Sequence, residues 1–133
     1  MLGQMKPGQG AGTLRILIVD DSPHFLNAAR AALEQDGITV VGVASAITEA
    51  IQLAGELHPD GILVDVDLGD ESGLDLAREF AAWGAAPVIL ISAYPESELA
   101  DLIADSPAVG FVSKSELSAR VVSSLLAPER ATG

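Results

Sequence analysis

The chain has 133 residues, a length typical of one domain, and 49% of them are hydrophobic, which is ample for a single core. Its formal net charge of −12 argues against nucleic-acid binding, because contacts with phosphates require clustered Lys and Arg. The lack of cysteine excludes disulfides and thiolate metal sites, and no apolar run has the ~20 residues that a membrane helix needs. We therefore expect a cytoplasmic protein that does not contact a membrane.

Both ends of the chain are predicted to lie outside the folded domain. Residues 1–13 are rich in Gly and Gln and lack the apolar segment of a signal peptide, so we interpret them as a disordered leader. Pro128 ends the last helical pattern, and residues 127–133 are expected to form a short tail. The folded domain is therefore predicted to cover residues 14–126.

Between these ends, apolar strand patterns alternate with amphipathic helix patterns along the chain. The predicted strands cover residues 14–20, 38–43, 60–66, 87–92 and 109–113. Two of the predicted helices begin at Pro23 and Pro95, where a proline suits the first turn. Three more cover about 46–57, 73–83 and 115–126. In the helix that follows Pro95, Leu99, Leu102 and Ile103 form the apolar stripe, and residues 67–72 are predicted to be a polar loop. The alternation predicts a doubly wound α/β fold, a parallel sheet with helices on both faces.

Polar residues follow four of these apolar strand patterns. They are Asp20 and Asp21, Asp65, Ser92 and Lys114. The carboxyl ends of parallel strands share one edge of the sheet, where ligands bind, so these side chains are expected to meet there. Three carboxylates, a hydroxyl and an ammonium suit a divalent cation together with a phosphoryl group.

These residues and their spacing resemble the receiver domain of two-component response regulators. The segment "LVDVDLGDESGLDL" carries Asp65 and Gly73 at the family's spacing, and "GFVSK" resembles the family's fifth strand. The resemblance covers roughly Leu14 to Leu126. It implies a flavodoxin-like five-stranded sheet in the order 2-1-3-4-5.

The resemblance also implies a phosphorylation switch rather than an enzyme acting on other substrates. Asp65 would accept a phosphoryl group from a histidine kinase or phosphotransfer protein and would catalyse its own phosphorylation and dephosphorylation. Mg²⁺, or Mn²⁺ in its place, would be held by Asp20, Asp21, Asp65 and the backbone carbonyl of Asp67. The Lys114 ammonium and the Ser92 hydroxyl would contact phosphoryl oxygens.

In the family, phosphorylation changes a surface away from the phosphoacceptor. Ser92 would move toward the phosphate, and Phe111 would move inward into the vacated space, or remain a static core aromatic. The output surface would comprise the helix after Pro95, strand 109–113 and helix 115–126. This surface would control an unidentified partner or output domain and could also form a homodimer.

Three positions depart from the family's pattern or could tune it. Ser115 replaces a proline after Lys114, which predicts either a trans bond with a shifted loop or a strained cis bond. Asp67 could bind a metal water or orient a hydrolytic water, or it could face solvent. Tyr94 could gate the access of water or of the phosphodonor.

Two other functions remain open from the sequence. The chain could be an adaptor that binds partners without phosphorylation. Alternatively, "DVDLG" resembles the nucleophile motif of a phosphatase class in which Asp65 would attack the substrate and Asp67 would act as acid and base. The chain could act alone or be a receiver cut from a longer regulator.

Overall fold

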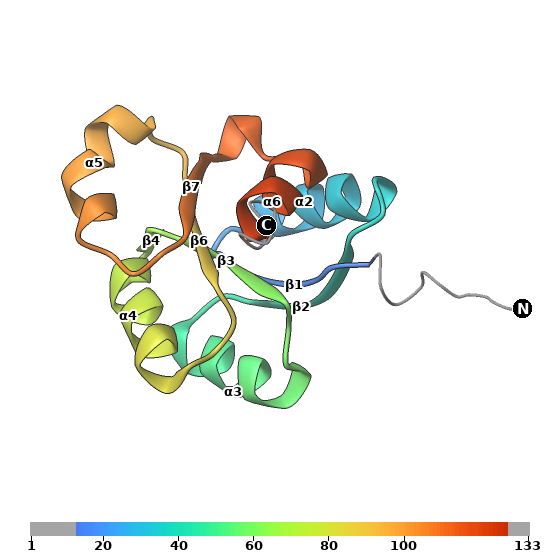
Figure 1. Cartoon of the computed structure of the whole chain (residues 1–133), viewed down its shortest axis with the longest axis horizontal. Coiled ribbons are helices and arrows are strands. Elements are labelled where there is room, and N and C mark those ends of the chain that lie inside the picture. Colours follow the sequence, from blue (N-terminus) through green and yellow to red (C-terminus); the bar gives the residue numbers. More distant parts are fainter. Residues whose placement is uncertain (1–12, 128–133) are drawn as a thin grey trace, which may run out of the picture.

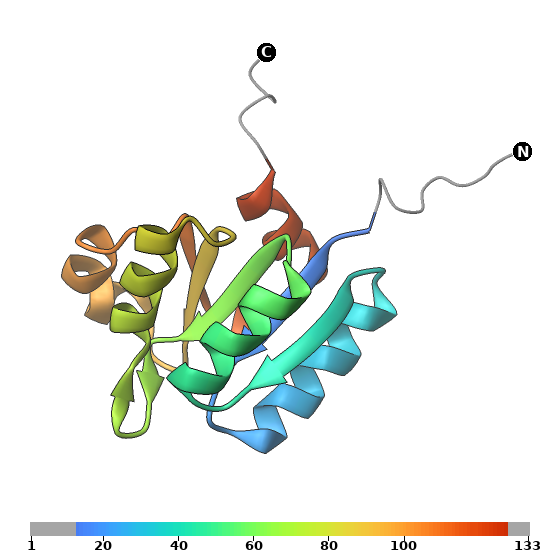
Figure 2. The same ribbon diagram turned by 90° about the horizontal axis from the view of Figure 1, so that it is seen from below.

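The computed structural model describes residues 13–127 and places a parallel sheet between two layers of helices (Figure 1, Figure 2). The strands of this sheet are β1 (Arg15–Val19), β2 (Thr39–Ala44), β3 (Gly61–Asp65), β6 (Val88–Ser92) and β7 (Gly110–Ser113). The helices are α2 (Pro23–Gln35), α3 (Ile47–Leu57), α4 (Gly73–Trp83), α5 (Glu96–Ala104) and α6 (Ala119–Leu126). The strand order β2-β1-β3-β6-β7 confirms the predicted flavodoxin-like order. The predicted leader and tail fall almost wholly outside the described residues.

The core consists of one apolar cluster on each face of the sheet. On one face, β-strand side chains pack with α3 and α4, where Phe80 of α4 is fully buried. On the other face they pack with α2 and α6, around the buried Leu33. Every residue of β3 and β6 is buried, as expected for central parallel strands covered on both sides.

Local capping explains where α2 and α4 begin. The Ser22 hydroxyl accepts the Phe25 N–H at the start of α2, and Pro23 occupies the first helical turn. The Ser72 hydroxyl accepts the N–H groups of Leu74 and Asp75 at the start of α4. These serine caps place the two helices directly after the strands that precede them.

The predicted polar loop at 67–72 is instead a short antiparallel hairpin. Its strands are β4 (Asp67–Leu68) and β5 (Glu71–Ser72). The turn between them uses Gly69 at φ +76°, a left-handed conformation that glycine adopts readily. Leu68 is buried in the core, which anchors the hairpin and explains why this polar segment is ordered.

The last two predicted helices also differ from the sequence pattern. Residues Lys114–Glu116 form a 3₁₀ turn, η2, and α6 begins only at Ala119, because the Ser118 hydroxyl caps it by accepting the Val121 N–H. In α5 no residue is buried, and Leu102 of the predicted apolar stripe is 48% exposed. This helix lies beside the edge strand β7, at the periphery of the molecule (Figure 1). Because the sheet ends at β7, α5 packs against it on one side only and stays partly exposed.

Candidate functional site

The strand register brings the predicted polar residues to one edge of the sheet. Val19 pairs with Val64, so Asp20 and Asp65 follow at the same level. On the next strand Ile91 pairs with Asp65, and Ser92 pairs with Ser113, the residue before Lys114. The four strand ends therefore meet at the carboxyl edge, as the sequence pattern predicted.

Asp20 is fully buried at the centre of this edge. Its Oδ1 accepts the Ser22 N–H at 2.9 Å, and its Oδ2 lies 2.6 Å from the Lys114 Nζ as an ion pair. Among residues 13–127, the Lys114 ammonium is the one polar partner of this Oδ2. A buried carboxylate oxygen with only an ammonium beside it still has lone pairs available to a cation.

Asp65 is buried next to it, with 5% of its surface exposed. Its Oδ1 accepts the Asp67 N–H at 3.1 Å, and its Oδ2 accepts from the Lys114 Nζ at 3.1 Å. Burial, together with the neighbouring Asp20 carboxylate, raises the pKa of Asp65 from 3.8 to about 6, although the Asp67 N–H and Lys114 oppose the shift. The ionised form of Asp65 is therefore destabilised in the absence of a cation.

Lys114 bridges the two buried carboxylates. Burial alone would lower the pKa of its ammonium, but Asp20 and Asp65 together outweigh that effect and raise it above the usual value. The ammonium also lies over the Phe25 ring, 4.4 Å from the centroid. The described residues contain no cis peptide bond, so the Lys114–Ser115 bond is trans and the chain continues into η2.

Three carboxylates are close enough to share one metal ion. One oxygen each from Asp20, Asp21 and Asp65 lies within 4.8 Å of the other two. Asp21 is exposed, whereas the other two are buried, so solvent reaches the cluster from the Asp21 side. Hard oxygen donors beside solvent suit Mg²⁺, which keeps several of its waters. The Asp20 Oδ2, whose one polar partner is the Lys114 ammonium, keeps a lone pair for such an ion.

The remaining predicted site residues lie around this cluster, and two of their side chains make local contacts. The Asp67 side chain is exposed, and its Oδ1 accepts the Gly69 N–H at 3.2 Å, so it supports the hairpin turn. The Ser92 hydroxyl is buried and accepts the Tyr94 N–H at 3.0 Å. Tyr94 itself is 57% exposed.

Phe111 on β7 is half-buried and packs against the α3–α4 core cluster. It also lines a cavity of about 300 Å³ with Pro95, Ser113 and Ser115. A half-buried ring beside a cavity has room to change its position.

Three contacts at this edge were not predicted from the sequence. Phe25 was assigned only to the core face of its helix, and nothing in the sequence pairs it with the distant Lys114, which follows β7. The Glu71 side chain reaches α3, where its Oε1 accepts the Ile47 N–H at 2.9 Å. Gly69 lies so close to the acidic cluster that a Cβ there would sit 3.1 Å from an Asp21 oxygen.

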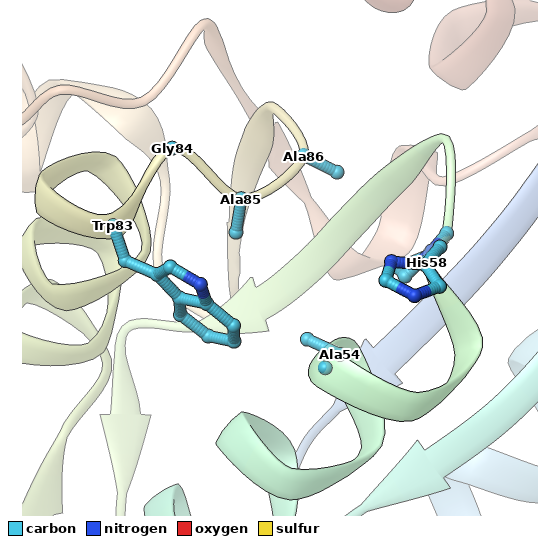
Figure 3. Close-up of a pocket in the computed structure, with 8 residues that line it drawn as sticks. Ala54, His58, Trp83, Gly84, Ala85 and Ala86 are labelled. Carbon is cyan, nitrogen blue, oxygen red and sulfur yellow. The ribbon is translucent and has the colours of Figure 1, made fainter.

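A second hollow lies at the opposite, amino edge of the sheet. This cavity of about 360 Å³ is lined by the ends of α3 and α4 and the segments that lead into β3 and β6, including His58, Trp83 and Ala85 (Figure 3). It contains no carboxylate. The acidic cluster at the carboxyl edge is therefore the stronger candidate for phosphoryl chemistry.

The family model for the response regulator receiver domain matches residues 16–125. The chain belongs to the response regulator receiver family. This receiver is 30% identical over 115 residues to the transcriptional regulatory protein PdtaR of Mycobacterium tuberculosis. The match covers 86% of this chain and 56% of PdtaR. It is also 35% identical over 99 residues to the transcriptional regulatory protein KdpE of the same organism. That match covers 74% of this chain and 43% of KdpE. The receiver thus spans about half the length of these curated relatives.

A solved structure supports the same assignment. The signal receiver domain of the response regulator NarL from Mycobacterium tuberculosis matches with a TM-score of 0.76 and 25% identity, covering 87% of this chain and 98% of that one. Membership assigns this receiver a phosphorylation-dependent role in signalling, in a family that works with kinases and output domains. Among the helices between residues 13 and 127, none is long and apolar enough to span a bilayer.

Proposed function

We propose that this receiver is a switch in which Asp65 accepts a phosphoryl group from a histidine kinase or phosphotransfer protein. The observation that carries the proposal is the Lys114 ammonium, which bridges the Oδ2 atoms of Asp20 and Asp65 inside a three-carboxylate cluster. In the reaction, an Asp65 oxygen forms a bond to phosphorus while the bond from phosphorus to the donor's imidazole nitrogen breaks. The electron pair of the broken bond stays on that nitrogen.

The residues around Asp65 have distinct tasks in this proposal. Asp20, Asp21, Asp65 and the Asp67 carbonyl would hold Mg²⁺, or Mn²⁺ in its place, which supplies positive charge to the phosphoryl oxygens when bound. Lys114 would exchange its contact with Asp65 for a phosphoryl oxygen. The Ser92 hydroxyl would donate to another oxygen and release the Tyr94 N–H that it now accepts.

The change at Ser92 would reach the surface formed by α5, β7 and α6. Ser92 ends the strand that pairs with β7, and Phe111 of β7 has a cavity beside it. Leu102 and Val109 on this surface are each about half exposed, 48% and 49%. These features support a partner, an output domain or a second copy as the occupant of this surface after phosphorylation.

Intact mass after incubation with acetyl phosphate tests the proposal. The wild type should gain one phosphoryl group when Mg²⁺ is present, and Asp65→Asn should gain none. Chelation of Mg²⁺ should also prevent the gain. An unmodified wild type, together with partner binding that Asp65→Asn leaves unchanged, would instead support the phosphorylation-independent adaptor.

A further inference from the structure

The Phe25 ring occupies the third side of the Lys114 ammonium. A lysine ammonium has three N–H donors, and here two of its sides face carboxylate oxygens, at 2.6 Å in Asp20 and 3.1 Å in Asp65. The Phe25 ring lies under the same nitrogen, 4.4 Å from the centroid. Aromatic faces attract cations electrostatically at this distance, and more strongly when the cation is partly desolvated. The Lys114 side chain is only 18% exposed.

Local structure places the ring there. Phe25 lies in the first turn of α2, where its N–H donates to the Ser22 hydroxyl at 3.2 Å. That cap directly follows the two carboxylates of the cluster, so the ring and Asp20 are fixed by the same turn. Phe25 is half-buried and lines a cavity of about 240 Å³ with Lys114 and Leu117, so its ring is not enclosed in the close-packed core.

The Lys114 backbone directly follows the paired residue Ser113, but a flexible four-carbon side chain separates it from the ammonium. The residue opens the short 3₁₀ turn η2, in which the Leu117 N–H reaches the Lys114 carbonyl at 3.5 Å. Such a long contact is at the limit of hydrogen bonding. The position of the ammonium therefore depends on the side chains that it contacts. Two of these are the carboxylates of Asp20 and Asp65, and the third, the Phe25 ring, is uncharged.

We propose that Phe25 is a positioning residue for phosphoryl transfer, whose ring face holds the Lys114 ammonium at the acidic cluster while the ammonium turns from Asp65 to a phosphoryl oxygen. A carboxylate in the place of the ring would add repulsion to a cluster that already contains three. An aromatic face stabilises the cation without adding charge and without one fixed bonding direction. The inference rests on the proposed function, because it concerns the same phosphorylation.

A graded ring series tests this role without changing the shape of the side chain. Phenylalanine, 4-fluorophenylalanine and 3,4,5-trifluorophenylalanine at position 25 withdraw charge progressively from the ring face. The maximal rate of phosphorylation by acetyl phosphate with Mg²⁺ should fall stepwise along the series, with a smaller change in the half-saturating acetyl phosphate concentration. Melting temperatures should stay similar.

Two conventional variants complete the test. Phe25→Leu keeps an apolar side chain but removes the ring, and should slow phosphorylation by about tenfold. Phe25→Trp keeps an aromatic face and should retain most of the rate. In NMR spectra, the ring should shift the side-chain proton resonances of Lys114 upfield, and Phe25→Leu should abolish that shift.

The outcomes separate this inference from the proposed function. If the wild type is phosphorylated but its rate is the same across the fluorinated series, only the role of Phe25 is overturned. An Lys114 spectrum that does not respond to Phe25→Leu would overturn it as well. If the wild type is not phosphorylated at all, the proposed function fails and the role of Phe25 fails with it.

Discussion

At the scale of single residues, Asp65 combines burial with charge. Its carboxylate is almost completely enclosed and lies beside a second buried carboxylate, and the single bridging ammonium does not offset both effects. A cation or a proton relieves the repulsion. The burial and charge that suit the acidic cluster to a metal ion therefore make the folded protein less stable when the cluster is ionised and holds no ion.

Replacing this carboxylate by an amide should stabilise the metal-free protein. Because the pKa of Asp65 is raised to about 6 in the folded state, the folded protein binds more protons than the unfolded chain between about pH 4 and 6, and stability falls as pH rises through that window. Asp65→Asn cannot ionise. At pH 7.5 with a chelator it should exceed the wild type by roughly 1–3 kcal/mol in urea unfolding.

The advantage of Asp65→Asn should shrink as the pH is lowered toward 4.5, because Asp65 of the wild type is then protonated when folded. Asp70→Asn is the matched control, since Asp70 is exposed on the neighbouring hairpin and should show little effect at either pH. An Asp65→Asn advantage that does not vary with pH would contradict the raised pKa.

At the scale of elements, the β4–β5 hairpin connects the acidic cluster to α3. Gly69 at its turn lies against Asp21, and Leu68 fixes it in the core. Glu71 at its far strand accepts the Ile47 N–H at the start of α3, where Ala46 offers no side-chain cap. The hairpin thus supplies a cap that the local sequence of α3 lacks.

Removing this cap should loosen the first turn of α3. Glu71→Ala leaves the Ile47 N–H without its partner, and should cost about 0.5–1.5 kcal/mol in urea unfolding. Amide hydrogen exchange at Ile47 should also become faster. Asp70→Ala on the same hairpin is the control and should change neither quantity; equal effects of the two variants would show that Glu71 does not act as a cap.

Replacing two helical glycines by alanine should change the free energy of unfolding in opposite directions. At Gly73, the first residue of α4, a Cβ would lie 1.8 Å from the Asp65 carbonyl oxygen, so the backbone must move. We expect Gly73→Ala to lose about 3 kcal/mol or more of unfolding free energy. At Gly55 in α3 a Cβ would meet only Trp83, at an ordinary 3.8 Å, and Gly55→Ala should gain about 0.5–1 kcal/mol.

Thermal unfolding of both glycine variants measures this difference directly. A stable Gly73→Ala protein would contradict the close approach of α4 to β3, the strand that carries Asp65.

At the scale of the whole molecule, a metal ion at the carboxyl edge should stabilise the entire fold. The three clustered carboxylates come from the ends of β1 and β3, two central strands, so an ion that binds only the folded state shifts unfolding by mass action. At ten times its dissociation constant, Mg²⁺ should add about 1.4 kcal/mol and raise the melting temperature by a few degrees.

Titration of MgCl₂ against KCl of equal ionic strength measures this stabilisation by differential scanning fluorimetry. Asp21→Asn should reduce it, because Asp21 is an exposed member of the cluster and its loss should not disturb the core. Asp101→Asn on α5 should leave it unchanged. A melting temperature that rises equally in both salts would argue against a metal site.

Sequence alone predicted the alternation of strands and helices, the strand order through family resemblance, and the placement of Asp20, Asp21, Asp65 and Lys114 at one edge. The alternation and the strand-end placement follow from apolar periodicity and from the polar residues after each strand, which are local properties of the chain, whereas the strand order rested on the resemblance. The expected polar loop and the early start of the last helix were wrong, because a buried Leu68 and the Ser118 cap decide those segments.

Tertiary structure alone decided the contacts between segments that are distant in sequence. The ring of Phe25 meets Lys114, Glu71 caps α3, and α5 stays exposed at the edge of the sheet. Such contacts depend on how strands stack side by side and on the direction of individual side chains. Periodicity reports which face of an element is apolar, but it does not report which distant side chain lies opposite.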